Sequence, residues 1–367
     1  MHVGKGLFIQ NLGTGVRTDR ETIALEMELG VRAEAEGFGS LWTAEHHFTG
    51  YHMVPGVAQL LSYLAARTTQ VKLGSMVVVL PWHDPARVAG ELAMLDNLSG
   101  GRLILGLGRG LGKVEFDAMR LEMGESRERF VEYSEALIEA FDTGVIRHDG
   151  PLYKQPPTDI RPAPFQSLRG RTYASAVSPA SLDIMIKLGF GVLVNAQKPW
   201  DMTRTEVLGY RDRFIEVNGY APPKPMLVMF TCVHESEAAA REMFERYIVP
   251  NTRSTVDHYE FDNINLADIP GYEYYGRLAG TIAKHGKEKF VEFLSDLQIY
   301  GTPSQVTEQM VEKVRMLDGA GVIANLCFGD MPDDVARANQ ALFARRVLPA
   351  LRSVDPDREL PTVLVPA

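Results

Sequence analysis

The sequence predicts a (β/α)8 barrel, a closed ring of eight parallel strands, each followed by a helix. Two observations lead to this fold. Short apolar runs alternate with longer segments of helical spacing eight times along the 367 residues. No low-complexity segment divides the chain. We therefore expect one domain over residues 1–367.

The first half of the chain supplies four strand–helix pairs. The run VKLGSMVVVL is the clearest strand, because a strand buried on both faces is continuously apolar and rich in β-branched residues. Asp84 and Pro85 then provide the N-cap and the first residue of a helix. The expected strands are 6–12, 38–42, 71–80 and 102–107, and the expected helices are 20–36, 55–67, 85–99 and 125–143.

The second half repeats the alternation with two longer excursions. The segment 148–170 is rich in proline, and we expect it to cover one rim of the barrel. The segment 251–295 follows the seventh strand and mixes aromatic residues, acids and glycines. We expect it to form a lid over substrate, with simple peripheral helices as the alternative. The expected strands are 172–176, 190–194, 226–233 and 322–328, and the expected helices are 179–188, one ending at 218, 236–247 and 332–351.

Net charge, cysteine content and the length of apolar runs indicate which partners the protein can have. The formal net charge is −9 and there is no run of basic residues, so nothing favours a nucleic-acid partner. Cys232 and Cys327 stand in apolar runs and are expected to be buried free thiols. The N-terminus has no leader-like pattern, and no apolar run is long enough to span a membrane. We expect a soluble cytoplasmic enzyme with no membrane partner.

A group of titratable residues, Glu45-His46-His47, follows the second strand. The carboxyl ends of barrel strands are where active sites form, and histidine titrates near neutral pH. We expect a catalytic role for the three, with one imidazole as general acid or base and the acid orienting it or holding nearby backbone. Neighbouring strand residues point to opposite faces, so the pair is a poor metal site and no metal is expected. A hydrogen-bonded pair at the barrel rim is the alternative.

Three further features indicate an anion site at the same end of the barrel. Arg109 lies in a Gly-x-Gly-x-Gly turn after the fourth strand, and Arg127 begins the fourth helix. Ser178 and Ser181 surround a proline at the start of a helix, where free N–H groups and hydroxyls favour an anion. Together these groups would bind a phosphomonoester. A tight turn, a surface charge and a plain N-cap are the respective alternatives.

At these residues the chain resembles the luciferase-like flavin monooxygenases, and among them most the catalytic alpha subunit of bacterial luciferase. The resemblance covers nearly the whole chain in order and spacing. It is carried by GFGSLWTAEHHFT, LPWHDPAR, LDNLSGGRLILGLGRGLGKVEF, ESR at Arg127, IYGTPSQV and GVIANLCFG. The resemblance implies a (β/α)8 barrel, reduced FMN delivered by a separate flavin reductase, and a homodimer or related heterodimer.

The resemblance also implies roles for particular residues. His46 matches the catalytic histidine, flanked by Glu45 and His47. Met76 and Val77 match a cis peptide that backs the flavin ring. The segment 251–295 matches a mobile lid. The expected flavin contacts are Gly108, Arg109, Arg127, Ala176, Val177, Ser178 and Ser181. The chain departs from luciferase at Gly108 (a cysteine there), Val177 (a glutamate) and Ala196 (a tryptophan), which argues against light emission and a long-chain aldehyde.

The implied reaction is a monooxygenation. Reduced FMN activates O2 as a flavin hydroperoxide, which oxidises an apolar aldehyde, ketone or related small molecule. Three alternatives remain. They are a deazaflavin-dependent oxidoreductase of the same superfamily, a non-catalytic luciferase-like partner subunit, and a metal hydrolase built on Glu45, His46 and His47.

Overall fold

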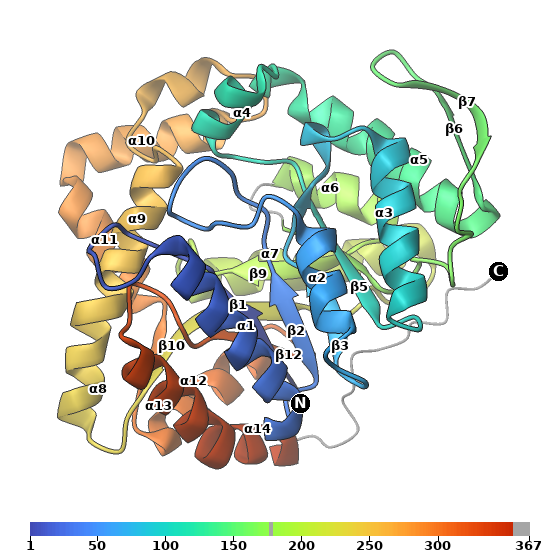
Figure 1. Cartoon of the computed structure of the whole chain (residues 1–367). Helices are drawn as coiled ribbons and strands as arrows, with labels where there is room; N and C mark the ends of the chain where they lie inside the picture. The colour runs from blue at the N-terminus through green and yellow to red at the C-terminus, as the bar shows by residue number, and fades with distance from the viewer. Residues whose placement is uncertain (176–178, 355–367) are drawn as a thin grey trace.

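The computed structural model describes residues 1–175 and 179–354, and it confirms the predicted (β/α)8 barrel (Figure 1). Eight strands pair in parallel in chain order, and the last pairs with the first, so the sheet closes. The barrel strands are β1 (His2–Leu7), β2 (Ser40–Thr43), β3 (Lys72–Ser75), β5 (Leu103–Gly108), β8 (Thr172–Ser175), β9 (Gly191–Asn195), β10 (Met226–Val233) and β12 (Gly321–Asn325).

Large side chains fill the interior of the barrel. Trp42 on β2 and Tyr173 on β8 are buried and meet edge to face, with ring centroids 6.5 Å apart. The Trp42 ring needs a glycine beside it, because a Cβ atom on Gly74 would lie 2.2 Å from the ring. The interior is therefore a packed core, and any ligand site is left to the mouth at the carboxyl ends of the strands.

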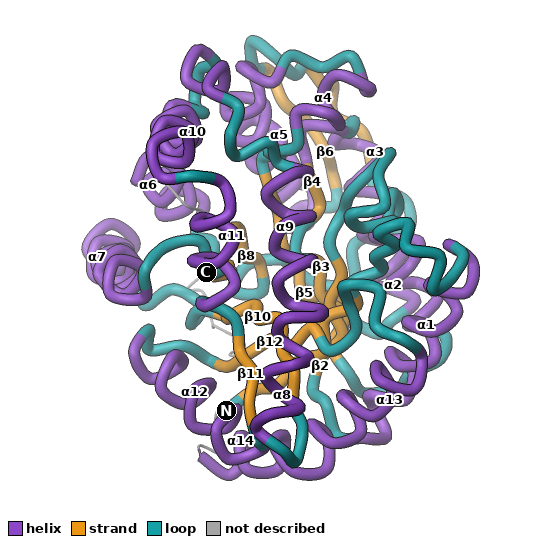
Figure 2. Tube along the Cα trace, turned by 90° about the vertical axis from the view of Figure 1, so that its left-hand side faces the viewer, coloured by secondary structure: helices purple, strands orange, loops and turns teal. Residues whose placement is uncertain are grey.

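Helices form the outer layer, as Figures 1 and 2 show. Thr18 and Glu21 form a capping box at the start of α1, and Asp84 caps α3 through the Arg87 N–H as expected. The surrounding helices are α1 (Asp19–Glu36), α2 (Val57–Ala65), α3 (Pro85–Leu98), α5 (Ser126–Thr143), α6 (Pro179–Leu188), α7 (Trp200–Asn218), α8 (Glu237–Met243), α12 (Pro303–Met316), α13 (Asp333–Leu342) and α14 (Leu348–Val354).

The prediction of one continuous strand over 71–80 was wrong. The chain forms β3, leaves the ladder at a cis Met76–Val77 peptide, and continues as the short β4 (Val78–Val79). Two side chains hold this break, because Ser75 Oγ bonds both backbone groups of Gly106 and the Glu45 carboxylate accepts the Val79 N–H. Apolar patterning does not show such a break, since these residues are buried or half-buried.

Other boundaries also differ from the predictions. The first strand ends at Leu7, because the following residues turn away to pair with the loop after β2, where Ile9 accepts the Met53 N–H. Several elements were not predicted, among them α4 (Lys113–Met119), β11 (Ile299–Gly301) and α12. Both α4 and β11 are too short for periodicity to show. Cys232 and Cys327 are buried free thiols, as predicted.

The two excursions have different structures. Part of 148–170 lies in a hairpin of β6 (Val145–Asp149) and β7 (Lys154–Asp159), which projects from the body of the molecule (Figure 1). The segment 251–295 is mainly helical: α9 (Val249–His258), the 3-10 helix η4 (Ile264–Asp268), α10 (Glu273–His285) and α11 (Lys287–Asp296). Its buried residues Val256, Phe261 and Tyr275 share an apolar cluster with Trp82 and Phe116, so it packs over the mouth of the barrel.

None of the helices in the described ranges is both long enough and apolar enough to cross a lipid bilayer.

Candidate active site

Two adjoining cavities open at the mouth of the barrel. The first contains Arg109 and Arg127 and is called the arginine cavity. The second contains Asn251 and Asn325 and is called the amide chamber. The cavities share a wall made of Ala44, His46, Met76, Asn195, Gln197 and Tyr259.

His46 lies in this shared wall, where the chain leaves β2. Its Nδ1 atom is 3.0 Å from Glu115 Oε1, and its Nε2 atom is 3.2 Å from the Tyr259 hydroxyl. The imidazole is buried, with rings of Tyr51 and His258 against it at centroid distances of 5.0 and 4.9 Å. These two contacts fix the orientation of the imidazole ring, with Nδ1 directed at Glu115 and Nε2 directed at Tyr259.

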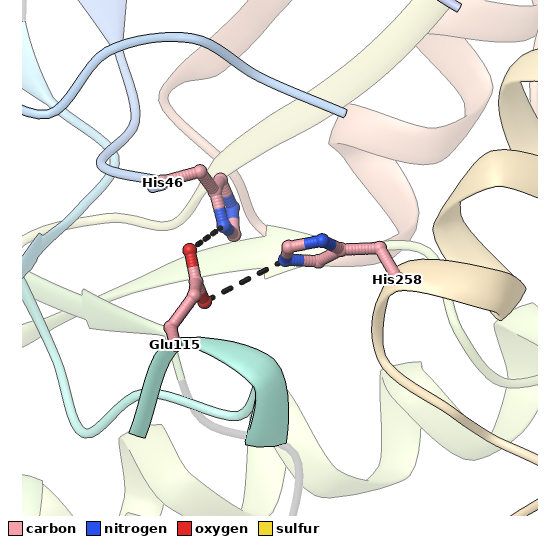
Figure 3. Close-up of side chains that lie close together, drawn as sticks. All are labelled: His46, Glu115 and His258. Atoms are coloured by element: carbon pink, nitrogen blue, oxygen red, sulfur yellow. Dashed lines mark hydrogen bonds and ion pairs between the residues drawn. The ribbon is translucent and has the colours of Figure 1, made fainter. Parts of the chain in front are cut away.

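Glu115 on α4 fixes the hydrogen-bonding roles of His46 (Figure 3). Burial opposes ionisation of Glu115, but contacts with His258 and His46 outweigh it and hold the pKa of its carboxyl well below the usual value. An ionised carboxylate only accepts, so we assign the Nδ1 proton to His46 and leave Nε2 as an acceptor. Burial lowers the pKa of His46, and the Glu115 charge offsets only part of this effect. A neutral His46 has an unprotonated Nε2, which accepts from the Tyr259 hydroxyl and is the proton acceptor that a general base needs.

The side chains of Glu45 and His47 are hydrogen-bonded to each other. Glu45 Oε1 accepts from His47 Nε2 at 2.8 Å and from His83 Nε2 at 2.6 Å, and Oε2 accepts the Val79 N–H at 2.8 Å. Burial disfavours the charge on Glu45, but the two histidines outweigh it and lower the pKa of the carboxyl. This cluster holds the end of β2 against β4, beside the cis peptide. Glu45 lines the arginine cavity, whereas His47 is not among its described lining residues.

A different trio has the donor types of a metal site. His46, Glu115 and His258 each place one nitrogen or oxygen within 4.8 Å of the others (Figure 3). The carboxylate already serves the protein itself, because Oε1 accepts from His46 and from the His47 N–H, while Oε2 lies 3.5 Å from His258 Nε2. The trio is a carboxylate between two imidazoles, and within the described residues Glu115 Oε2 and His258 Nε2 are buried without a hydrogen-bond partner. Absence of a metal stays a prediction.

Arg109 and Arg127 converge in the arginine cavity, as the expected phosphate site requires. Both donate to the carbonyl of Gly271, at 2.8 and 3.3 Å, and the Arg109 guanidinium lies 4.0 Å from the centre of the Tyr272 ring. Neither forms an ion pair with a carboxylate in the described part of the chain. The Nε atom of Arg127 is buried without a hydrogen-bond partner. The Glu273 carboxylate accepts the Gly271 N–H and interacts electrostatically with both guanidiniums, but it forms no ion pair with either. Two positive charges without a directly contacting carboxylate fit a phosphate.

The other expected flavin contacts are distributed around this cavity. Met76, Val77, Gly108 and Ser181 line it. Gly108 allows β5 to approach the cis peptide, because a Cβ there would lie 2.3 Å from Val77 Cγ2. The expected contacts Ala176, Val177 and Ser178 lie outside the described residues.

Sequence reasoning missed three residues of the site: Glu115, His258 and Tyr259. Glu115 stands between apolar neighbours in a short helix, and a lone acid between Val114 and Phe116 was the available signal. His258 and Tyr259 end α9 inside the predicted lid, where aromatic residues were noticed but not assigned to His46. Their proximity to β2 depends on how the insertion folds back, which local patterns do not encode.

Comparison with known proteins identifies the family of this chain. The family model of the luciferase-like monooxygenases matches residues 1–318. The alkanal monooxygenase alpha chain of Aliivibrio fischeri is 32% identical over 327 residues, which are 88% of this chain and 91% of that protein. Monooxygenase RslO1 from Streptomyces bottropensis superposes with a TM-score of 0.80 at 24% identity, over 95% of this chain and 99% of that chain.

A structure with bound flavin shares the fold. The oxygenating constituent of 3,6-diketocamphane monooxygenase from Pseudomonas putida, in complex with FMN, has a TM-score of 0.71 at 18% identity, over 96% of this chain and 98% of that chain. F420-dependent enzymes also have this fold, at 13% and 19% identity. From the family match and the sequence relative together, this chain belongs to the luciferase-like monooxygenase family and is a flavin-dependent monooxygenase.

Proposed function

We propose that this enzyme uses reduced FMN, delivered by a separate flavin reductase, to insert one oxygen atom of O2 into a small organic substrate. The observation that carries the proposal is the arginine pair, which forms no ion pair with a carboxylate in the described ranges and lines the same cavity as His46. Reduced FMN would supply the electrons that activate O2. A two-component arrangement is supported by the relative described as an oxygenating constituent in complex with FMN.

In this proposal, cofactor binding is assigned to residues of the arginine cavity and proton transfer to residues of the shared wall. Arg109 and Arg127 would bind the phosphate of FMN, with Ser181 and the predicted Ser178 beside them. Met76 and Val77 would lie along the flavin ring, where Gly108 permits close approach. In the shared wall, His46 Nε2 would accept or return a proton at the reacting atoms, with the Tyr259 hydroxyl 3.2 Å away.

The packing of the insertion fits this chemistry. Tyr259, Tyr274 and Tyr275 bring the segment 251–295 against the arginine cavity. Excluding water from such a site favours transfer of oxygen to substrate over release of peroxide. That the segment opens and closes as a lid remains part of the proposal, as does a homodimer.

An oxygen-labelling experiment tests the proposed function. The purified chain is mixed with photoreduced FMN, or separately with reduced F420, under 18O2 and a panel of candidate substrates. We expect label in a product only with FMN. Hydride transfer from F420 without incorporated label would overturn the proposal in favour of the deazaflavin alternative, and no turnover by the single chain would favour a non-catalytic partner subunit.

A further inference from the structure

The amide chamber has a chemistry that neither the family nor the proposed cofactor specifies. Rings of Phe8, Tyr51, Phe230, Tyr259 and Phe261 form much of its wall. Phe8 and Phe230 meet edge to face at 5.0 Å, and Tyr259 stacks on Phe261 at 5.5 Å. Flat aromatic walls favour a flat aromatic ligand, which can stack or meet them edge to face.

Five side-chain amides interrupt these aromatic walls: Asn195, Gln197, Asn251, Gln298 and Asn325. Gln298 is satisfied within the protein, since its oxygen accepts the Phe230 N–H at 3.1 Å. Asn251 and Asn325 differ, because each side chain is only 1% exposed and its Oδ1 atom is buried without a hydrogen-bond partner. Buried amide oxygens are normally paired, so these two indicate a missing donor.

The chamber also excludes full charges. No Asp, Glu, Lys or Arg is found among its described lining residues. Burial raises the pKa of Tyr51 to about 12 and that of Tyr259 well above its usual value, so both phenols are neutral donors. A carboxylate or ammonium ligand would lose its hydration here without gaining an opposite charge.

We propose, on the basis of the function proposed above, that the substrate is a neutral aromatic compound that carries ring hydroxyl groups. Its ring lies between the aromatic walls, and its hydroxyls pair with Asn251 and Asn325. A hydroxyl both donates and accepts, so it satisfies either end of an amide. The ring then lies next to the shared wall, within reach of His46 and the arginine cavity. An alkyl aldehyde has no donor, so it would leave both Oδ1 atoms unpaired.

Binding without turnover tests this substrate class. The full chain is titrated calorimetrically, in the absence of any reductant, with 1-naphthol, naphthalene, 1-naphthoate and decanal. We expect 1-naphthol to bind at least about tenfold more tightly than naphthalene or decanal, and 1-naphthoate to bind more weakly than all three. Equal or tighter binding of decanal or 1-naphthoate would overturn the proposal.

Two variants locate the interaction. Asn251→Leu and Asn325→Leu have similar volume but lack the amide. Because 1-naphthol has one hydroxyl proton to donate, at least one of the two variants is expected to weaken 1-naphthol binding about three- to tenfold while naphthalene binding stays or improves. Asn265→Leu, at an exposed position on η4, is the matched control. Naphthalene binding reports folding of each variant. An unchanged ratio of 1-naphthol to naphthalene affinity in both leucine variants would contradict the assignment.

The outcome is separable from that of the proposed function. A chain that ranks the four compounds as expected but gives no labelled product with reduced FMN keeps the substrate class and loses the cofactor assignment. A chain that oxidises decanal with FMN but does not favour 1-naphthol keeps the cofactor assignment and loses the substrate class.

Discussion

Glu115 on α4 accepts a hydrogen bond from His46 Nδ1 at 3.0 Å and so links a helix after β5 to the end of β2. The same carboxylate lies 3.5 Å from His258 Nε2, on the insertion that covers the mouth. One buried charge therefore orients the candidate base and also contacts the segment that encloses it. Glu115 is a positioning residue, because it acts on the reaction through His46.

The first prediction concerns the pH profile of Glu115→Gln. The Glu115 charge and hydrogen bond raise the pKa of His46, so their loss should lower that pKa further. A base must be neutral to work, and the acid limb of kcat/KM should therefore move to lower pH. The plateau should fall about tenfold, because the imidazole is less firmly oriented.

The matched control for this measurement is Glu122→Gln, an exposed acid a short distance along the chain. A purely structural role for Glu115 would lower the plateau and leave the limb where it is. That result would count against the positioning role.

The fold was predictable because each barrel strand and helix has its own local pattern, as VKLGSMVVVL and the Asp84 cap illustrate. A similar reason made three site residues predictable from the sequence, since His46, Arg109 and Arg127 follow strands or begin helices at one end of a parallel barrel. Glu115, His258 and Tyr259 were not, because their contacts with His46 span 69, 212 and 213 positions or depend on the folded insertion. The break at Met76–Val77 appeared only through the resemblance, since its residues look like strand.

Replacing His46 should uncouple the reaction. His46→Ala removes the only imidazole in the described wall shared by both cavities, while the arginine pair is untouched. We expect FMN binding to be retained, product per reduced FMN to fall about 100-fold or more, and H2O2 to be released instead. Product and H2O2 are measured together, with the exposed His285→Ala as control. Unchanged coupling in His46→Ala would remove this residue from the mechanism.

A buried ion pair provides a test of the fold. Lys5 Nζ on β1 lies 2.9 Å from Glu26 Oε2 on α1, and both side chains are 0% exposed. Lys5→Met leaves the Glu26 charge buried and unpaired, so the free energy of unfolding in urea should fall by about 3–5 kcal/mol. The double change Lys5→Met with Glu26→Leu should recover most of this loss. Arg87→Ala, in a pair that is 82% and 55% exposed, should cost less than about 1 kcal/mol.

The pairing of Glu45 with His83 should make stability depend on pH. Burial opposes the charged form of His83, but Glu45 outweighs it and raises the pKa of His83 above its unfolded value of 6.5, while the pKa of Glu45 is lowered. The contribution of His83 is therefore complete below its unfolded pKa and is lost as the pH rises through its folded pKa. The contribution of Glu45 is lost as the pH falls below its unfolded value of 4.5.

His83→Ala should thus destabilise the protein most near pH 6, by about 1 kcal/mol, and least near pH 9. Urea unfolding at a series of pH values measures the difference from the unmodified chain. His285→Ala should show no such trend. A difference that grows between about pH 6 and pH 9 would show that the ion pair has been assigned the wrong sign.

Removal of either guanidinium of the arginine pair should weaken FMN binding through its phosphate alone. Arg109 and Arg127 meet at the Gly271 carbonyl with no carboxylate partner in the described ranges, so a phosphate gains charge-assisted hydrogen bonds from both. Arg109→Ala and Arg127→Ala should each raise the dissociation constant for FMN about 10- to 100-fold. Riboflavin has the same ring without the phosphate, and its affinity should change less than about twofold. Arg87→Ala on the exposed face of α3 controls for net charge. Equal losses for FMN and riboflavin would mean that the arginines support the cavity instead of binding phosphate, because a phosphate contact cannot affect a ligand that lacks one.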